Sequence, residues 1–437
     1  MSVVDTAVAR GNAAPTTSVS SHHNLPVGSL SGCQVCAATD LELVLDLGYH
    51  APCDSLLRQD QLREVEKTYP LRFLRCRHCG LAQIDYVADP RELFYPEYPY
   101  RSGITETLSR NLQAMTVKLC DELNLARGSL VVDIGSNDGT LLQGFKSRGM
   151  KVLGVEPTNI AKIAVEHGIQ TIQDFFCEAL AKEIRAKHGG SSIVTAANMF
   201  AHVASLGELI RGVRELLVDG GLFLTESHYL LDLLQTVQYD SIYHEHLKYY
   251  ALKPLTALLR DYQFTIVDAE RIPNYGGSIR VYAKKGTGHP ASRRLCELLE
   301  TEEREQLYSP QPFAQFRERT IRSKLNLQAL LVDLKRRGKR VVGIGCPGRA
   351  STLLNYCSID PDLLPYIAEQ SSSLKLGLFL PGKHIPIVDE RIMFEENPDY
   401  AVILSWHYAQ PIIAKLRQKG LRSKLILPLP EVRVLED

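Results

Sequence analysis

The sequence predicts an α/β protein in three parts: an N-terminal metal-binding module, a central doubly wound parallel sheet and a smaller α/β unit at the C-terminus. Three observations lead to this prediction. Two Cys-x-x-Cys pairs lie between residues 32 and 96, buried strands alternate with helices over 129–227, and a second alternation begins at residue 339. Strands and helices that alternate at this spacing indicate parallel strands joined by crossover helices.

The elements of the first two parts follow in chain order. Residues 1–31 are rich in Ser, Ala, Thr and Asn without periodicity, which predicts a disordered tail. In the metal-binding module, residues 32–96, the alternating segment 69–76 predicts a strand. The central domain, residues 97–287, is expected to contain a helix at 104–125, a strand and glycine turn at 129–139, strands at 151–157, 170–176, 191–200 and 222–227, and an antiparallel edge pair at 262–272 and 278–285.

The C-terminal part, residues 288–437, begins with linking helices. The charged segment 291–337 is predicted to be helical, with a break at 309–312. Strands are expected after it at 339–345, 364–370, 384–389, 400–404 and 424–428. Because strands and helices alternate again, we expect a second, Rossmann-like unit.

Composition places the chain with ordinary globular enzymes. Its 437 residues suffice for two to four domains, and 45% of them are hydrophobic. Fifty basic and fifty acidic residues give a net charge of zero, which argues against nucleic-acid binding because phosphates require a basic excess. No apolar run predicts a membrane span, and the N-terminus lacks the pattern of a secretion signal. We therefore expect a cytoplasmic protein that contacts neither nucleic acid nor membrane.

Four of the ten cysteines form the two Cys-x-x-Cys pairs. In a chain without a secretion signal, metal binding explains such pairs better than disulfides do. Each turn places two sulfurs on one side of a metal, and two turns complete a tetrahedral shell. A complete shell has no open position for substrate, so a structural Zn²⁺ is predicted. Its ligands are Cys33, Cys36, Cys76 and Cys79.

The segment 131-VVDIGSNDGTLL-142 predicts a cofactor site. Asp133 ends the first strand, and Gly135 and Gly139 let the backbone approach a ligand closely. Glu156 ends the second strand, where a carboxylate can accept both hydroxyls of a ribose. The pattern is looser than a dinucleotide fingerprint and suits S-adenosylmethionine, which has no pyrophosphate. The remaining residues assigned to this site are Ser136 and Asn137 in the turn, Asp174 and Phe175 after the third strand, and Asn198 after the fourth.

The densest group of chemically active side chains is 239-YDSIYHEHLKYY-250. It follows the strand 222–227, whose carboxyl end faces the predicted cofactor cleft. Histidine suits proton abstraction near neutral pH, and a neighbouring carboxylate can orient it. The alternatives are a polar loop or a second zinc site built from the His-x-His and Glu of this segment. His202 follows the fourth strand on the same side, and the tyrosine-rich segment 95–103 is either a lid or a packed loop.

In their order along the chain, these motifs resemble those of the sugar C-methyltransferase family of deoxysugar biosynthesis. The resemblance covers residues 32–437 and rests on the cysteine pairs followed by DIGSNDGTLL, GVEPT, DFF, NMFAHV, YHEHLKYY, GGSIRVY, GCPGRASTLLNYC and PGKHIPI. It implies a class I methyltransferase sheet and methyl transfer from S-adenosylmethionine to C3 of a dTDP- or GDP-linked 4-keto-6-deoxyhexose, although some members methylate C5. The C4 carbonyl acidifies the hydrogen on C3, so a base can form an enolate that nearby donors stabilise.

The resemblance also assigns roles to individual residues. His246 corresponds to the general base, Tyr243, Glu245 and His202 lie in the same site, and the lid tyrosine is either Tyr98 or Tyr100. The C-terminal unit is expected to contact the nucleotide. At 345–351 the chain reads GCPGRAS, where family members often have Gly-Ala-Pro-Ala and then Lys-Gly, so the contacts there stay open. Candidate substrate-binding residues are Ser278, Arg280 and Trp406, with a solvated Arg280 and a core Trp406 as alternatives. A monomer or a loose dimer is expected.

Other functions compete with this one. The segment 343-GIGCPG-348 matches G-x-G-x-x-G after a strand, with Glu369 beyond it, which is the form of an NAD site. Pro347 argues against NAD because it removes an amide donor that a pyrophosphate would use. An O- or N-methyltransferase would use the same cofactor and a histidine base. A non-enzymatic zinc-ribbon protein would dock nucleic acid or a partner, and the zero net charge argues against it.

Overall fold

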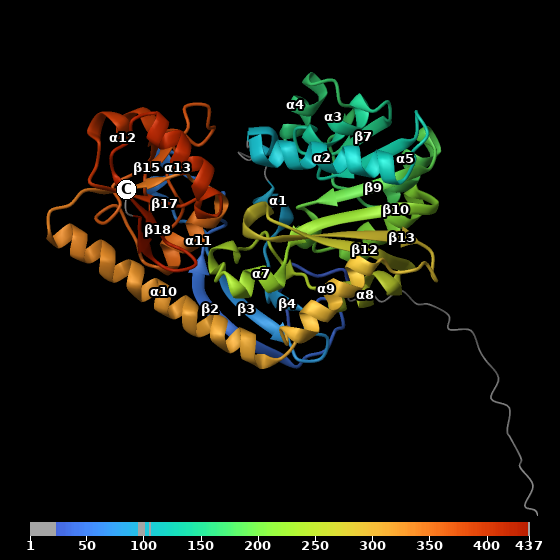
Figure 1. Ribbon diagram of the computed structural model, residues 1–437, viewed down its shortest axis with the longest axis horizontal. Helices are drawn as coiled ribbons and strands as arrows, with labels where there is room; N and C mark the ends of the chain where they lie inside the picture. The colour runs from blue at the N-terminus through green and yellow to red at the C-terminus, as the bar shows by residue number, and fades with distance from the viewer. Residues whose placement is uncertain (1–22, 95–100, 105, 436–437) are drawn as a thin grey trace, which may run out of the picture.

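Seven strands form the central sheet of this computed structural model, which describes residues 23–94, 101–104 and 106–435 (Figure 1). Their order is β12-β13-β10-β9-β6-β7-β8, and β13 alone is antiparallel to its neighbours. The doubly wound sheet and the antiparallel pair are therefore confirmed, but β13 lies inside the sheet, between β10 and β12. The strands are β6 (Leu130–Ile134), β7 (Lys151–Val155), β8 (Thr171–Ile172), β9 (Ser191–Ala197), β10 (Leu217–His228), β12 (Phe264–Ile272) and β13 (Ser278–Lys285).

Helices cover both faces of the central sheet, which is why a strand such as β6 is buried along its whole length. The apolar faces of α2 (Glu106–Glu122), α3 (Thr140–Ser147) and α4 (Ile160–Glu166) pack in one core cluster. The second cluster, on the other face, contains the apolar residues of α5 (Glu178–His188), α6 (Leu206–Leu216), α7 (Leu230–Gln235) and α8 (Leu252–Asp261).

The N-terminal module is a four-stranded antiparallel sheet, and the central domain contributes one of its strands. The strand order is β11-β4-β3-β2, with β2 (Leu41–His50), β3 (Tyr69–Cys76), β4 (Ala82–Ile84) and β11 (Lys248–Tyr249). The predicted strand at 69–76 is β3. Strand β11 begins two residues after the end of the YHEH motif, so the module and the central domain share one sheet. The short helix α1 (Pro90–Leu93) comes after β4 in the chain.

The predicted tail is wrong for residues 23–31, which are ordered; residues 1–22 lie outside the described residues. The Nδ1 atom of buried His23 lies 2.7 Å from the Tyr262 hydroxyl oxygen, and its Nε2 atom lies 2.8 Å from the Val35 carbonyl oxygen. A short strand β1 (Gly28–Ser29) pairs with β5 (Tyr86–Val87). A few long-range contacts order this segment, and composition alone cannot reveal such contacts.

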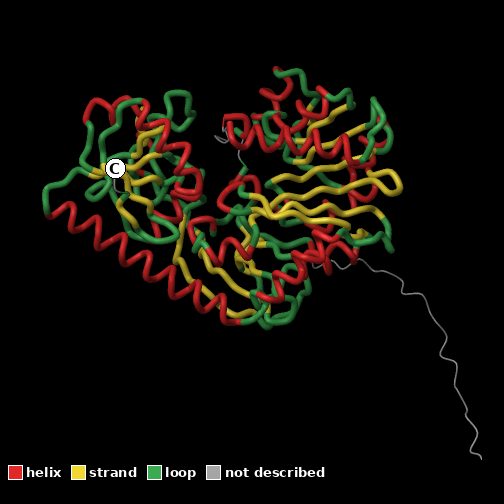
Figure 2. The backbone as a smooth tube through the Cα atoms, in the orientation of Figure 1, coloured by secondary structure: helices red, strands yellow, loops and turns green. Residues whose placement is uncertain are grey.

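The C-terminal unit is a second parallel sheet, with the order β16-β15-β14-β17-β18-β19 and only β19 antiparallel. Two helices lead to it, α9 (Arg293–Arg304) and the long α10 (Pro310–Arg336), which runs along the outside of the molecule (Figure 1). Figure 2 shows the strands of this unit and of the central sheet as two separate groups. The elements of the C-terminal unit are β14 (Val341–Ile344), α11 (Gly348–Tyr356), β15 (Ile367–Glu369), β16 (Ile387–Asp389), α12 (Glu390–Glu396), β17 (Tyr400–Ile403), α13 (Ala409–Gln418), β18 (Lys424–Leu427) and β19 (Arg433–Val434).

Candidate active site

A cavity of about 680 Å³ lies at the carboxyl ends of both parallel sheets. Residues that follow β6, β7, β9 and β10 line it on the central side, and residues that follow β14 and β17 line it on the C-terminal side. Open α/β sheets bind ligands at this edge, because the loops and helix N-termini that follow their strands converge there. The central domain and the C-terminal unit therefore line one shared cavity.

The turn after β6 brings the backbone to the wall of the cavity. Gly135 has a φ of 69°, and a Cβ there would come within 2.9 Å of the Cγ atom of Met199, so glycine alone fits. The Oγ atom of Ser136 and the Oδ1 atom of Asn198 are buried and have no hydrogen-bond partner in the described part of the chain. Because buried polar atoms are normally hydrogen-bonded, these two atoms suit a polar ligand.

Two carboxylates lie on the same wall. Glu156 accepts hydrogen bonds from the backbone N–H groups of Asn137 at 3.0 Å and Thr158 at 2.9 Å, which orient it at the end of β7. Asp133 accepts a hydrogen bond from the Thr195 hydroxyl at 2.6 Å, and burial raises its pKa to about 7. S-adenosylmethionine carries a sulfonium and an ammonium group, and nearby cations favour ionised carboxylates. The donors and acceptors of this wall therefore fit that cofactor.

Two of the residues predicted for the cofactor do not line the cavity. Gly139, with a φ of 79°, precedes α3, and a Cβ there would lie 3.0 Å from the Ile169 side chain, so packing explains this glycine. Asp174 is exposed, and its carboxylate accepts a hydrogen bond from the Phe175 N–H at 2.7 Å. The predicted residues that do line the cavity are Asp133, Gly135, Ser136, Asn137, Glu156, Phe175 and Asn198.

His246 lies on the cavity wall with one ring nitrogen fixed. Its Nδ1 atom lies 2.7 Å from the Ser241 carbonyl oxygen, which can only accept, so Nδ1 carries the hydrogen. The lone pair of the neutral ring is therefore on Nε2. Burial lowers the pKa of His246 well below its ordinary value, and His228 and His202 lower it further. The ring is thus neutral at pH 7, in the form that accepts a proton.

Two histidines and a tyrosine surround this ring. The ring centroids of His202 and His228 lie 4.8 and 4.7 Å from that of His246, and the Tyr243 ring lies at 3.9 Å. Burial lowers the pKa of His202 to about 4 and that of His228 to about 3. The sequence analysis missed His228, although it lies at the carboxyl end of a strand on the cofactor side, as His202 does.

The other two residues of the YHEH motif differ in position. Glu245 is buried and lines the cavity, and the Cys53 thiol donates a hydrogen bond to it at 3.5 Å. His244 lies apart from the cavity, with its Nε2 atom 3.3 Å from the Pro70 carbonyl oxygen. Among the described residues, one group with metal-ligand spacing includes Glu245, with Cys53 and Asp54, but none includes a histidine of this motif. The alternative of a second zinc site built from the His-x-His and Glu therefore finds no support.

The C-terminal half of the cavity contains two cations that the sequence analysis missed. The Nη2 atom of Arg349, in the first turn of α11, donates to the Asp240 carboxylate at 2.9 Å. The Nζ atom of Lys375 donates to the Asp54 carboxylate at 2.7 Å, and Asp54 raises the pKa of this ammonium group despite its burial. Both cations lie far in sequence from their partners, and no local pattern indicates such pairs. Tyr275, His407 and Tyr408 complete this half.

The three residues predicted to bind substrate do not line the cavity. The Ser278 hydroxyl donates to the Asn274 carbonyl at 3.0 Å. Arg280 is buried, with its Nη2 atom 2.7 Å from Glu226, because carboxylates on the neighbouring strands face it inside the sheet. The Trp406 indole N–H donates to Asp240 at 2.7 Å. Each of these polar groups is therefore hydrogen-bonded or ion-paired within the protein. The two candidates for the lid tyrosine, Tyr98 and Tyr100, lie outside the described residues.

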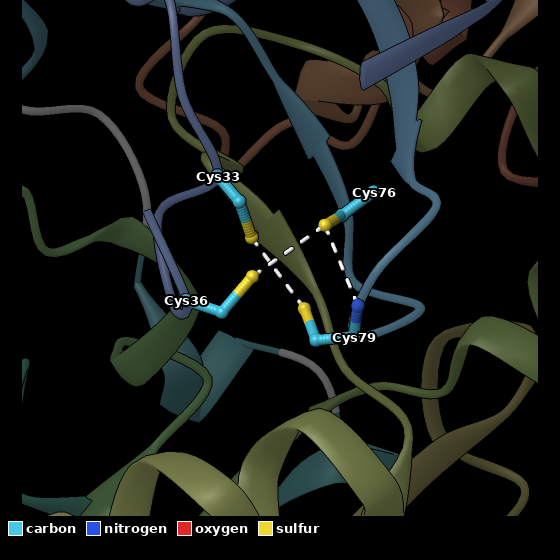
Figure 3. A group of neighbouring side chains, drawn as sticks. All are labelled: Cys33, Cys36, Cys76 and Cys79. Carbon is cyan, nitrogen blue, oxygen red and sulfur yellow. Dashed lines mark hydrogen bonds between the residues drawn. The ribbon is translucent and has the colours of Figure 1, made fainter. Parts of the chain in front are cut away.

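The predicted zinc ligands converge in the N-terminal module (Figure 3). The sulfur atoms of Cys33 and Cys79 are 3.5 Å apart, and those of Cys36 and Cys76 are 3.6 Å apart. Four thiolates at about 2.3 Å from a tetrahedral Zn²⁺ would be separated by roughly 3.8 Å. The four sulfurs therefore fit a structural zinc, and together they would fill all four positions of its tetrahedral shell.

Glu369, the acidic residue beyond the G-x-G-x-x-G turn at 343–348, is hydrogen-bonded within the protein. The Glu369 carboxylate accepts a hydrogen bond from the Cys346 N–H at 2.7 Å and is not among the residues that line the cavity. Pro347 precedes the first residue of α11 and has no N–H to offer. The turn therefore lacks two groups that a dinucleotide site would use, which argues against NAD.

Comparisons with known proteins agree with this architecture. Three family models match consecutive segments: "Putative zinc binding domain" over residues 33–94, "Methyltransferase domain" over 100–269 and "C-methyltransferase C-terminal domain" over 273–430. The fold and the site thus define an S-adenosylmethionine-dependent methyltransferase that carries a zinc module. C-methyltransferase NovU of Streptomyces niveus is 31% identical over 414 residues, which cover 94% of this chain and 98% of the relative. The chain belongs to the sugar C-methyltransferase family that its motifs indicated.

Solved structures match about two fifths of the chain at low similarity. A S-adenosylmethionine-dependent methyltransferase from Clostridium acetobutylicum is 14% identical, with a TM-score of 0.34, and covers 41% of this chain and 92% of its own. Magnesium protoporphyrin IX methyltransferase from Synechocystis, with bound SAH, is 16% identical, with a TM-score of 0.32, and covers 41% of this chain and 83% of its own.

Among the described residues, none of the helices has both the length and the apolar character needed to cross a membrane.

Proposed function

We propose that this C-methyltransferase adds a methyl group to C3 of a nucleotide-linked 4-keto-6-deoxyhexose. The observation that carries the proposal is the fixed tautomer of His246. Its Nδ1–H faces the Ser241 carbonyl at 2.7 Å, so the nitrogen with the lone pair is Nε2, on a ring that lines the cavity. A neutral imidazole in a buried cavity is suited to removing a proton from a carbon next to a carbonyl group.

The residues around His246 support an enolate mechanism. His246 Nε2 takes the proton from C3, and the electron pair of the C–H bond moves to form the enolate, whose charge lies on the C4 oxygen. His202 or the Tyr243 hydroxyl supplies a neutral hydrogen-bond donor to that oxygen, an effect worth about 3–4 kcal/mol per donor. S-adenosylmethionine supplies the electrophilic methyl group that C3 takes up. The protonated ring returns its proton to solvent after the product leaves.

The nucleotide belongs on the C-terminal side of the cavity. Arg349, Lys375 and the first turn of α11 line this half, and cations together with a helix N-terminus favour an anionic group such as a diphosphate. The cofactor belongs on the opposite wall, beside Glu156 and Asp133. The sugar would then lie between the two, next to His246.

The proposal is tested with S-adenosylmethionine and a panel of dTDP- and GDP-linked 4-keto-6-deoxyhexoses. We expect at least one sugar to gain the mass of one methyl group and to lose deuterium from a C3-labelled position. Loss of deuterium from C5 instead would place the reaction on the other side of the carbonyl. Methylation with all carbon-bound deuterium retained would mean transfer to oxygen or nitrogen and would contradict the proposal.

The cofactor wall gives a first prediction. Glu156→Gln should weaken S-adenosylmethionine binding about tenfold or more, because hydrogen bonds to charged groups contribute roughly 1.5–3 kcal/mol. Calorimetric titration of the full chain measures this. Asp174→Asn is the matched control, since that carboxylate is exposed and does not line the cavity, and its affinity should be unchanged. A larger loss in Asp174→Asn than in Glu156→Gln would mean that the cofactor carboxylate has been misassigned.

The pH dependence of the reaction gives a second prediction. Burial lowers the pKa of His246, and His228, His202 and Arg349 act in the same direction. Because the lowered pKa keeps the ring neutral in mildly acidic solution, kcat/KM for the sugar should stay level as the pH falls through the ordinary histidine value of about 6.5 and decrease only below it. S-adenosylmethionine is kept saturating at each pH, so that protonation of Asp133, whose pKa is about 7, does not limit the reaction through cofactor binding. Circular dichroism at each pH separates this decrease from unfolding. A decrease that starts at or above the ordinary value would argue against His246 as the base.

A further inference from the structure

Helix α11 of the C-terminal unit packs on the segment that precedes His246. The Arg349 Nη2 atom donates to one oxygen of the Asp240 carboxylate at 2.9 Å, and its Nε atom lies 2.8 Å from the other oxygen. That second oxygen also accepts a hydrogen bond from the Trp406 indole N–H at 2.7 Å. Asp240 is fully buried, so these three groups compensate a charge that would otherwise be costly to bury.

The same helix also holds the residue on the other side of Ser241. The Thr352 hydroxyl donates to the Ile242 carbonyl at 2.9 Å. Ser241 thus lies between two residues, Asp240 and Ile242, that are both anchored to α11. Its own carbonyl oxygen is the acceptor for His246 Nδ1. A carbonyl bonded to one ring nitrogen fixes the tautomer and the orientation of an imidazole.

We propose that Asp240 and Thr352 are positioning residues for His246. Together with Arg349 they hold the Ser241 carbonyl in place, and that carbonyl keeps the hydrogen of His246 on Nδ1 and the lone pair on Nε2. The proposal rests on the proposed role of His246 as the base. Because α11 belongs to the C-terminal unit and His246 to the central one, the ring is positioned across the interface between the two units.

Thr352 and Asp240 are the informative positions, because Arg349 also lines the cavity and its replacement would disturb substrate binding directly. Thr352→Val removes the hydroxyl donor at nearly constant shape, and Thr352→Ser retains it. Asp240→Asn keeps an acceptor for Trp406 and removes the charge that faces Arg349. Thr265→Val is the matched control, since it removes a hydroxyl that donates to the Gly286 carbonyl at 2.8 Å, at the edge of the central sheet.

The tautomer of His246 is read by ¹⁵N NMR of the full chain with labelled histidine, and His246→Asn identifies the signals. We expect Nδ1–H in the wild type and in Thr265→Val, and a new Nε2–H population in Thr352→Val and Asp240→Asn. The kcat of methyl transfer should fall about five- to tenfold in these two variants, with KM nearly unchanged in Thr352→Val, and Thr352→Ser should restore both readouts. A role in folding alone would lower the fraction of folded protein without moving the tautomer.

The outcomes separate this proposal from the proposed function. The NMR measurement needs no substrate, so a shifted tautomer in a protein that methylates none of the keto sugars would support the positioning residues and overturn the sugar chemistry. An unchanged tautomer in both Thr352→Val and Asp240→Asn would overturn the positioning role, whatever the substrate. A shifted tautomer with unchanged kcat would overturn it as well. If Thr352→Val does not fold, Asp240→Asn decides.

Discussion

His246→Asn should reduce both hydrogen exchange at C3 of the substrate and methyl transfer by about 10²–10⁴-fold, the usual contribution of a general base. Asparagine has nearly the size of histidine, and its amide can still donate to the Ser241 carbonyl, so the surrounding loop should keep its structure. It has no nitrogen that accepts a proton near neutral pH. Exchange is followed by NMR in deuterated water, which separates proton removal from the methyl transfer that follows it.

His244→Asn is the matched control for this experiment. His244 belongs to the same motif and is equally buried, but its Nε2 atom lies 3.3 Å from the Pro70 carbonyl oxygen and the residue does not line the cavity. Exchange and turnover should stay near the wild-type level in that variant, and S-adenosylmethionine affinity should be similar in both. Full exchange in His246→Asn would remove His246 from the mechanism, and the remaining candidates would be His202 and His228.

The sequence predicts those features of the molecule that depend on local pattern. The parallel sheets follow from alternating strands and helices, and the zinc site follows from two cysteine pairs, because each pair fixes two sulfurs through one short turn. The same holds for the cavity wall at Gly135 and Glu156, since the carboxyl ends of neighbouring parallel strands meet at one edge. In each case a short local pattern, or the order of neighbouring strands in the chain, decides the geometry.

The remaining part of the site depends on contacts between distant segments. Arg280 looked available for a diphosphate, but Glu226 and Glu270 on the neighbouring strands bind its guanidinium at 2.7 and 3.0 Å. Arg349 and Lys375 went unnoticed because their partners, Asp240 and Asp54, come from other parts of the chain. Ion pairs of this kind have no sequence period, so only the folded structure reveals which charges remain on the cavity wall.

The zinc module contacts the segment that follows His246. Gln34 lies between two of the cysteines, and its side-chain amide donates to the Leu247 carbonyl at 3.0 Å. The Ile84 N–H donates to the same carbonyl at 3.1 Å, and β4 pairs with β11 at the next residue, Lys248. The residue directly after His246 is therefore held by the module that the four thiolates close. Loss of the metal should disturb the position of the ring as well as the stability of the module.

Cys76→Ser should therefore abolish zinc binding, lower the thermal midpoint of unfolding and reduce C3 exchange in parallel. Structural Zn²⁺ contributes on the order of 10 kcal/mol to small zinc domains, which is comparable to the net stability of a typical domain, so the module should lose its fixed structure. Zinc content by mass spectrometry, thermal unfolding and exchange are measured on the same preparations. Cys296→Ser, an exposed cysteine outside the pairs, should leave all three at wild-type values. A zinc-free Cys76→Ser protein that still exchanges at the wild-type rate would show that β4 and Gln34 keep the segment after His246 in place without the metal.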